Sequence, residues 1–233
     1  MLALCLEGAR RNVTDGIDNI FIVAPDDADI RDMCRRESVN YINERELMGF
    51  GKDDIHVPYN RNGWLYQQLI KFKGYCLSPC YLALDADHVL LRPHQFVSGD
   101  QRIFYMADEF HQPYFEVINK LFGGTVQKAV KKSFISDKML FDAPLVAQML
   151  HEIGWHNELN WWESIVKYYA DSKSGFSEFE TYGSWLMARH KDIVVMRDCG
   201  RVKFSRKSDL RTCSFSQLQV LFQDALSVTE LKH

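Results

Sequence analysis

Hydrophobic residues follow two kinds of pattern along this chain. Leu2, Cys5 and Ala9 are apolar positions three to four residues apart, which predicts an amphipathic helix over the first thirteen residues. A continuous apolar run at 20–24 instead predicts a buried strand. Similar runs predict strands at 39–42, 81–84, 89–91, 103–107 and 193–196, and helical spacing recurs at 26–36, 64–74, 113–122, 144–153, 158–170, 178–190 and 216–226.

The alternation of predicted strands and helices indicates an α/β fold. Chains of this kind commonly form a layered, Rossmann-type fold with a central, mostly parallel sheet flanked by helices. A length of 233 residues suits one domain, and no repeat or linker rich in Pro, Gly or Ser divides the chain. We therefore expect a single domain over 1–233, with 200–233 forming a basic loop and a C-terminal helix.

Charge and apolar content exclude some classes of function. The chain has 28 Lys and Arg residues against 31 Asp and Glu residues, so it lacks the positive field that collects nucleic acid. Its apolar runs are too short to span a bilayer, and we expect no signal peptide and no anchor. Six scattered cysteines favour reduced thiols. We expect a cytoplasmic protein without a transmembrane segment, for which peripheral membrane contact stays open.

Asp85 and Asp87 directly follow the apolar run at 81–84. Ligands of open α/β sheets bind beyond the carboxyl ends of the strands, so these two carboxylates lie where chemistry is expected. If the chain stays extended there, both point to the same side and can hold Mg²⁺ or Mn²⁺ while substrate phosphates complete the octahedron. Acidic pairs at strand ends also form turns, which is the structural alternative.

The predicted helix at 64–74 has two distinct faces. Leu65, Leu69 and Phe72 share one face and are expected to pack inward. An adjacent face at helical spacing carries side chains suited to a ligand: Trp64, Gln67, Gln68 and Lys71. A solvated helix surface accounts for the same pattern and remains the alternative.

Two acidic residues are candidate general bases. Ser177 and Glu180 have the spacing of a capping box at the start of the predicted helix 178–190, which leaves Glu178 unexplained. A carboxylate at a helix N-terminus beside a cleft can deprotonate a sugar hydroxyl. Asp137 is the competing candidate, and His190, at the far end of the same helix, is a candidate third metal ligand.

Two further groups of residues have both a functional and a structural interpretation. Trp155 and Trp161 could stack on an acceptor sugar, although aromatic residues at helical spacing are more often core. A basic cluster could clamp a diphosphate, although a solvated loop is the simpler interpretation. This cluster comprises Arg201, Lys203, Arg206, Lys207 and Arg211.

Four segments together resemble a known family. They are Trp64-x-x-Gln67-Gln68-x-x-Lys71, the run from Tyr81 through Asp87 to Pro93, the run from Ile135 to Asp142, and Ser177-Glu178-Phe179-Glu180-x-Tyr182-Gly183. The combination spans roughly residues 60–190 and resembles a bacterial family of GT-A-type glycosyltransferase-like proteins. The resemblance implies a GT-A-like fold with a nucleotide-sugar cleft.

The resemblance also implies roles for individual residues. Asp87 would ligate the metal ion directly, and Asp85 would contact the ribose or a metal-bound water. Gln68 and Lys71 would lie near the nucleotide or the diphosphate. GT-A folds normally begin with a strand that contacts the base, whereas this sequence starts at the helix expected after that strand. Its absence would leave base recognition incomplete.

The predicted function is metal-dependent transfer of a sugar from a nucleotide-sugar donor to a glycan or lipid-linked acceptor, as in polysaccharide biosynthesis. Two alternatives remain open at this point. One is a degenerate GT-A domain that acts as a binding or scaffold module, which loss of the first strand favours. The other is a metal-dependent nucleotidyltransferase or phosphohydrolase, although such enzymes usually carry a Gly-rich phosphate loop or a nucleophilic Asp.

Overall fold

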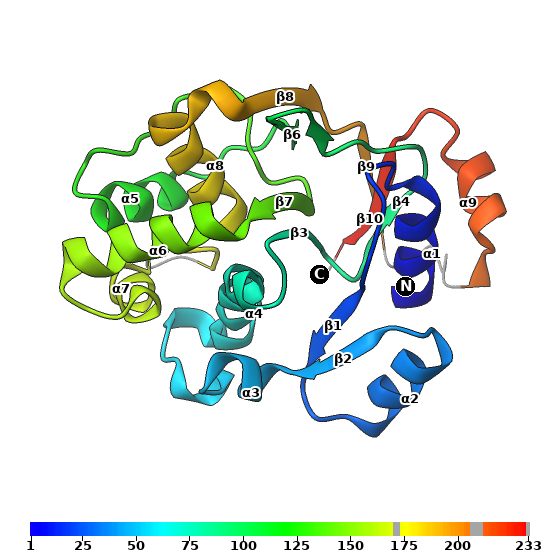
Figure 1. Ribbon diagram of the computed structural model, residues 1–233, viewed down its shortest axis with the longest axis horizontal. Helices are drawn as coiled ribbons and strands as arrows, with labels where there is room; N and C mark the ends of the chain where they lie inside the picture. Colours follow the sequence, from blue (N-terminus) through cyan, green and yellow to red (C-terminus); the bar gives the residue numbers. More distant parts are fainter. Residues whose placement is uncertain (170–172, 206–211, 232–233) are drawn as a thin grey trace.

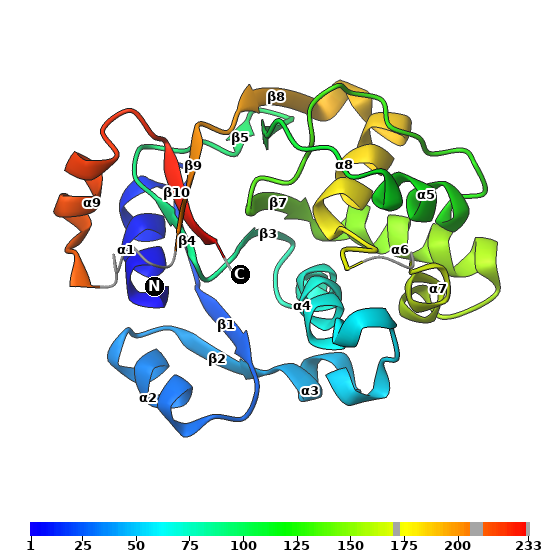
Figure 2. The ribbon, with the colours of Figure 1, turned by 180° about the vertical axis from the view of Figure 1, so that it is seen from behind.

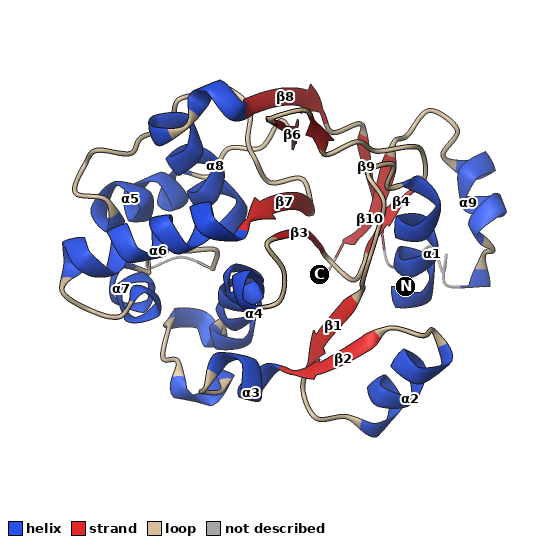
Figure 3. Ribbon diagram, in the orientation of Figure 1, coloured by secondary structure: helices blue, strands red, loops and turns tan. Residues whose placement is uncertain are grey.

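The computed structural model describes residues 1–169, 173–205 and 212–231. Helices and strands alternate along most of the chain, so the mixed α/β class is confirmed (Figures 1 and 3). The helices are α1 (Leu2–Asn12), α2 (Ala28–Arg36), α3 (Glu44–Met48), α4 (Asn62–Lys73), α5 (Gln112–Leu121), α6 (Ala143–Asn157), α7 (Trp161–Tyr168), α8 (Glu178–Arg189) and α9 (Phe215–Leu221). The strands are β1 (Phe21–Ala24), β2 (Asn40–Asn43), β3 (Cys80–Leu84), β4 (His88–Leu90), β5 (Val97–Ser98), β6 (Gln101–Met106), β7 (Lys138–Asp142), β8 (Val194–Asp198), β9 (Arg201–Ser205) and β10 (Ser227–Leu231).

The strands do not form the central, mostly parallel sheet that we expected. Within the described residues they pair as four small sheets, β1–β2, β3–β7, β4–β10–β9 and β5–β6–β8. The pairs β1–β2, β9–β10 and β6–β8 are parallel, whereas β3–β7, β4–β10 and β5–β6 are antiparallel. Only Gly99 and Asp100 separate β5 from β6. Such a short connection permits a hairpin but no parallel crossover.

The main hydrophobic core lies among α4, α5, α6, α7 and α8. These helices gather on one side of the molecule, next to β3 and β7 (Figure 1), and the opposite view shows the same grouping (Figure 2). Phe72, Phe141 and Trp185 are among its fully buried side chains. A second core lies under α1 and α9, which cover the sheet β4–β10–β9 on the other side of the molecule.

Helix α4 carries the two faces that the sequence predicted. Leu65, Leu69 and Phe72 are completely buried, which confirms the inward face. The hydroxyl of Tyr81 on β3 donates to the backbone carbonyls of Lys71, at 2.9 Å, and Phe72, at 3.1 Å. These bonds fix the last turn of α4 against the strand that leads to Asp85.

Helix α8 approaches the segment before β7 very closely at Gly183. A Cβ atom at this position would come within 2.2 Å of Cγ of Phe134. The glycine therefore lets the buried ring lie directly on the helix backbone. Glu180, one turn earlier, accepts hydrogen bonds from the hydroxyl of Ser133 and the backbone N–H of Phe134. This contact sets the position of the N-terminal end of α8.

Among the described helices, none combines the length and the apolar character needed to cross a bilayer.

Candidate functional site

An ion-pair cluster lies where β3 ends, between α4 and α8. Nζ of Lys71 is 2.5 Å from Oδ1 of Asp85 and 2.5 Å from Oε1 of Glu178. The Lys71 side chain is 14% exposed and that of Glu178 is 5% exposed. The structure thus brings together three residues from three of the predicted motifs. The Lys71 side chain is paired with the two carboxylates and is mostly shielded from solvent.

Burial and neighbouring charges shift the pKa values of Lys71 and Asp85. Burial lowers the pKa of Lys71, but the carboxylates of Asp85 and Glu178 outweigh it, so the pKa lies above its ordinary value. Burial raises the pKa of Asp85 to about 6. The positive charge of Lys71 opposes this effect, whereas the negative charges of Asp137 and Glu178 add to it. Three acidic side chains, Asp85, Asp137 and Glu178, thus act on or beside the single ammonium group of Lys71.

Gln68 connects α4 to the first residue of α8. Its Oε1 accepts the backbone N–H of Glu178 at 3.1 Å, while its Nε2 donates to the carbonyl of Trp64. Ser177 caps the same helix end by accepting the N–H of Glu180 at 3.3 Å, as predicted. Glu180 itself turns to Ser133 and so does not complete the reciprocal half of the capping box. Two side chains therefore satisfy the amide groups that start α8.

Asp137 lies beside Asp85 and directly precedes β7. Its backbone carbonyl accepts the N–H of Asp85 at 3.0 Å. Its φ angle is 60°, a left-handed conformation that is unfavourable for a residue with a side chain. Burial raises the pKa of Asp137, but the guanidinium of Arg201 outweighs it and holds the pKa below its ordinary value. Strain of this kind is frequent at functional sites.

A row of buried hydrogen bonds leads from β7 to Asp137. The Thr229 hydroxyl donates to Oδ2 of Asp137 at 2.8 Å and lies 2.5 Å from Nδ1 of His88. Because the Thr229 proton is used on Asp137, Nδ1 of His88 is the donor in the second bond. Nε2 of His88 is then the acceptor that faces Nζ of Lys138 at 3.5 Å. All donors in this row point toward Asp137.

Asp85 and Asp87 form a turn rather than a continuation of the strand. The N–H of His88 donates to the carbonyl of Asp85 at 2.9 Å, which closes the turn. The expectation of an extended segment is therefore wrong at this point. Burial raises the pKa of the Cys5 thiol to about 12, and the charges of Asp85 and Asp87 add to this effect.

The donor chemistry at this turn fits a hard divalent cation. Asp85 and Asp87 each supply a carboxylate, and the backbone carbonyl of Asp85 lies 3.7 Å from Sγ of the buried Cys5. Mg²⁺ is commonly bound through one or two carboxylates together with substrate phosphates. Across residues 1–169, 173–205 and 212–231, no group of three or more His, Cys, Asp or Glu side chains is arranged to hold a metal ion by itself. The protein would thus supply two ligands to the metal ion, Asp85 and Asp87, and the substrate phosphates would supply others.

Comparisons with known proteins identify the family of this chain. Residues 4–210 match the family of unknown function DUF6492. The chain belongs to this family. A search of curated proteins finds no match. Among solved structures, the apo form of mouse xyloside xylosyltransferase 1 is similar, with a TM-score of 0.49 and 13% sequence identity over 98% of this chain and 90% of that chain.

Other predicted site residues of this DUF6492 chain lie elsewhere. His190 follows the last residue of α8, so the whole helix separates it from Glu178, and its ring contacts Trp185 at 5.1 Å between centroids. Trp161 packs edge-on against Phe72 in the core. Trp155 is 75% exposed near the end of α6. Of the predicted basic cluster, Arg206, Lys207 and Arg211 lie outside the described residues.

Arg201 is the member of that basic cluster that reaches the site. Its guanidinium pairs with Asp137 and Glu109, and Lys203 pairs with Glu109 at 2.5 Å. The Arg201 side chain is only 4% exposed. Burial lowers the pKa of Arg201, but the two carboxylates outweigh it and raise the pKa. Sequence reasoning placed Arg201 in a solvated loop, whereas it is a buried partner of Asp137.

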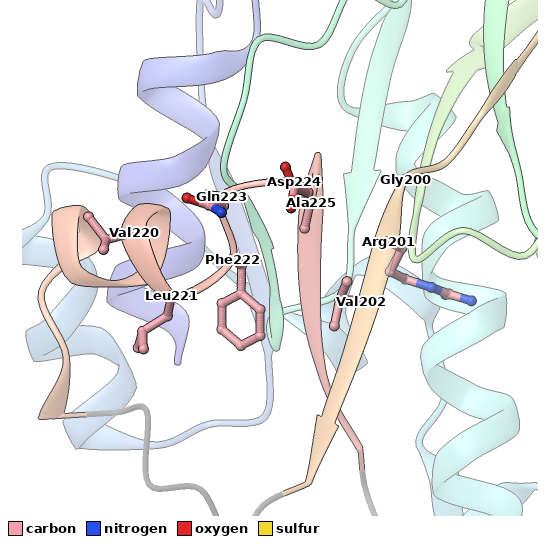
Figure 4. Close-up of a pocket in the computed structure, with 9 residues that line it drawn as sticks. All are labelled: Gly200, Arg201, Val202, Val220, Leu221, Phe222, Gln223, Asp224 and Ala225. Carbon is pink, nitrogen blue, oxygen red and sulfur yellow. The ribbon is translucent and has the colours of Figure 1, made fainter.

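A hollow of about 630 Å³ lies next to this residue, between α9 and β9 (Figure 4). It is lined by Gly200, Arg201, Val202 and the segment 220–225. The guanidinium of Arg201 points away from α9 in Figure 4, as its ion pairs require. The lining of this hollow, as far as the residues are described, does not include Asp85, Lys71 or Glu178.

Sequence reasoning missed Thr229 and Glu109 as neighbours of the site. His88 was considered only as one of several histidines that could supply a third metal ligand. Thr229 lies on β10, a strand that the pattern did not predict.

Proposed function

We propose that this protein is a glycosyltransferase that moves a sugar from a nucleotide-sugar donor to a glycan or lipid-linked acceptor. In this proposal Asp87 and Asp85 hold Mn²⁺ or Mg²⁺. The bound cation would neutralise charge on the departing diphosphate. The observation that carries the proposal is the meeting of Lys71, Asp85 and Glu178 at one point, because these residues come from three separate motifs of the family resemblance.

The surrounding residues take roles that follow from their contacts. Gln68 and Lys71 lie on α4 beside Asp85, where the donor's diphosphate would meet the metal ligands. Glu178, at the N-terminal end of α8, accepts the proton of the acceptor hydroxyl. Asp137 is less suited to this step, because Arg201 and Thr229 already occupy its Oδ2. It instead supports the turn that carries Asp85.

Ligand-dependent thermal stability tests the binding part of the proposal. UDP, GDP and CMP are added with and without Mn²⁺, and one nucleotide is expected to raise the Tm only when Mn²⁺ is present. At a ligand concentration about 100 times the Kd, the shift is roughly 5–10 °C for a chain of this size. The variant Asp87→Ala is expected to lose this shift.

Asp108 provides a matched control, because it also follows a strand, β6, but its side chain is 84% exposed. Asp108→Ala is expected to keep the full metal-dependent shift. If the protein is indifferent to every nucleotide with Mn²⁺, the binding or scaffold module is the better description and the transferase proposal is wrong.

Slow hydrolysis of donor sugars tests the catalytic part. Once a nucleotide is identified, its sugar derivatives are screened for release of sugar, with and without acceptors. Glu178→Gln is expected to lower acceptor-dependent turnover by about 100-fold or more, while leaving the nucleotide-induced Tm shift in place. A turnover that survives in Glu178→Gln but not in Asp137→Asn would assign the base to Asp137 instead.

A further inference from the structure

Lys71 lies between two carboxylates that belong to different elements. Its Nζ is 2.5 Å from Oδ1 of Asp85, after β3, and 2.5 Å from Oε1 of Glu178, on α8. The ring of Phe179 lies over the same ammonium group, with 4.3 Å between Nζ and the ring centroid. The ammonium group of Lys71 is therefore bound to the carboxylate of Asp85, which is also a ligand of the proposed metal site.

An ammonium group and a divalent cation compete when they need the same carboxylate. Asp85 can neutralise only one unit of positive charge, and the two cations repel each other strongly at contact distance in a partly buried site. Glu178 gives Lys71 a second anionic partner, so the lysine does not lose all compensation when it leaves Asp85. A retreat toward Glu178 is thus open to the side chain.

We propose that Lys71 is a built-in competitor at the metal site, which pairs with Asp85 in the ligand-free protein and is displaced from Asp85 when a divalent cation binds. The inference rests on the proposed function, because it takes Asp85 and Asp87 as the metal ligands. The donor's diphosphate offers the displaced ammonium a new partner. Metal binding is therefore weak in the protein alone and is strengthened by the donor.

Titration of the whole chain with Mn²⁺ alone, followed by calorimetry or by the spectroscopic signal of free Mn²⁺, tests the competition. Lys71→Met removes the ammonium but keeps an unbranched side chain. It is expected to bind Mn²⁺ at least about tenfold more tightly than the wild type. Lys71→Arg keeps the charge and is expected to stay within about threefold of the wild type.

Lys73 supplies a control for general charge effects. It lies two residues further along α4, where its Nζ is 5.5 Å from the centroid of the Tyr75 ring. Lys73→Met removes the same charge from the same helix, and its Mn²⁺ affinity is expected to stay within about twofold of the wild type. Equal gains in Lys71→Met and Lys73→Met would overturn the inference.

A second variant covers the case in which Lys71→Met does not fold. Lys71→Met combined with Glu178→Gln removes one charge of each sign and keeps Asp85, and it is also expected to bind Mn²⁺ more tightly than the wild type. Mn²⁺ binding with the same Kd in the wild type and in every Lys71 variant would overturn this inference alone. Failure of all variants to bind Mn²⁺ would overturn the proposed metal site as well.

Discussion

A single amide side chain holds the candidate base in position. Gln68 reaches from α4 to the backbone N–H of Glu178, the first residue of α8. That N–H has no partner inside its own helix, and both residues are buried. Gln68 is therefore a positioning residue, because it acts on Glu178 rather than on a substrate.

Replacing Gln68 by Met is expected to lower the free energy of unfolding by about 1–2 kcal/mol, since the buried N–H of Glu178 loses its acceptor. Urea unfolding measures the change. Gln67→Met is the matched control, because Gln67 is the exposed neighbour on the same helix, and its effect should stay within about 0.5 kcal/mol. Equal losses in the two variants would mean that the bond to Glu178 contributes nothing.

Much of the site's membership could be predicted from residue types and spacing. Gln68 and Lys71 were assigned to a face adjacent to the buried stripe of α4, and Glu178 remained after the helix cap was explained. Their contacts with one another could not be predicted. The Lys71 and Glu178 pair spans 107 positions of the chain, and only tertiary packing brings such residues together.

At the scale of elements, α8 depends on one glycine for its approach to the core. Phe134 occupies the space that a side chain at position 183 would need. The same helix carries Glu178 at its N-terminal end and Glu180 toward Ser133. A displacement of α8 at Gly183 would therefore move Glu178 away from Lys71.

Gly183→Ala is expected to destabilise the protein by about 1–3 kcal/mol, because the new methyl group overlaps the Phe134 ring in a packed core. Chemical unfolding tests this. Gly63→Ala in α4 is the control, because a Cβ atom at Gly63 would meet only a flexible Lys52 side-chain carbon, at 3.9 Å. Alanine there is expected to be neutral or stabilising by up to about 1 kcal/mol. A neutral Gly183→Ala would show that Phe134 can move aside.

Helices were easier to predict than strand pairing. The predicted helices at 26–36 and 113–122 correspond closely to α2 and α5, because helical periodicity is a local property. Strand β7 was missed, although its apolar run of Met139, Leu140 and Phe141 is as long as the run at 89–91 that predicted a strand. Its antiparallel pairing with β3 depends on two segments more than fifty positions apart, which no local pattern encodes.

At the scale of the whole molecule, two histidines, His88 and His94, are completely buried. His94 exchanges backbone hydrogen bonds with Asn12 and Thr14, and His88 on β4 pairs with Thr229 on β10. Burial, together with the positive charge of Lys138, lowers the pKa of His94 to about 4 and that of His88 well below its ordinary value. Both rings are therefore neutral in the folded protein at neutral pH.

Protonation of the two histidines should destabilise the fold between pH 6.5 and about 4. The unfolded forms of His88 and His94 bind more protons than the folded forms across this window, so their contribution to the free energy of unfolding falls as the pH falls, whereas Asp85, with its raised pKa of about 6, contributes in the opposite direction. His94 alone accounts for about 3 kcal/mol. Urea unfolding at pH 7, 6 and 5 measures the slope. His94→Leu should flatten it, whereas replacement of the exposed His151 by Leu should not. An unchanged slope in His94→Leu would contradict the assignment.

The junction of Lys71 with Asp85 and Glu178 has a consequence for folding kinetics. Lys71 and Glu178 are 107 positions apart in the chain. Bringing them together is entropically unfavourable until the elements that carry them have docked. We therefore expect the charged centre to form late in folding, after α4, β3 and α8 are in place, because its three residues come from these separate parts of the chain. A compact chain with native helices but loose side-chain packing would have no such centre.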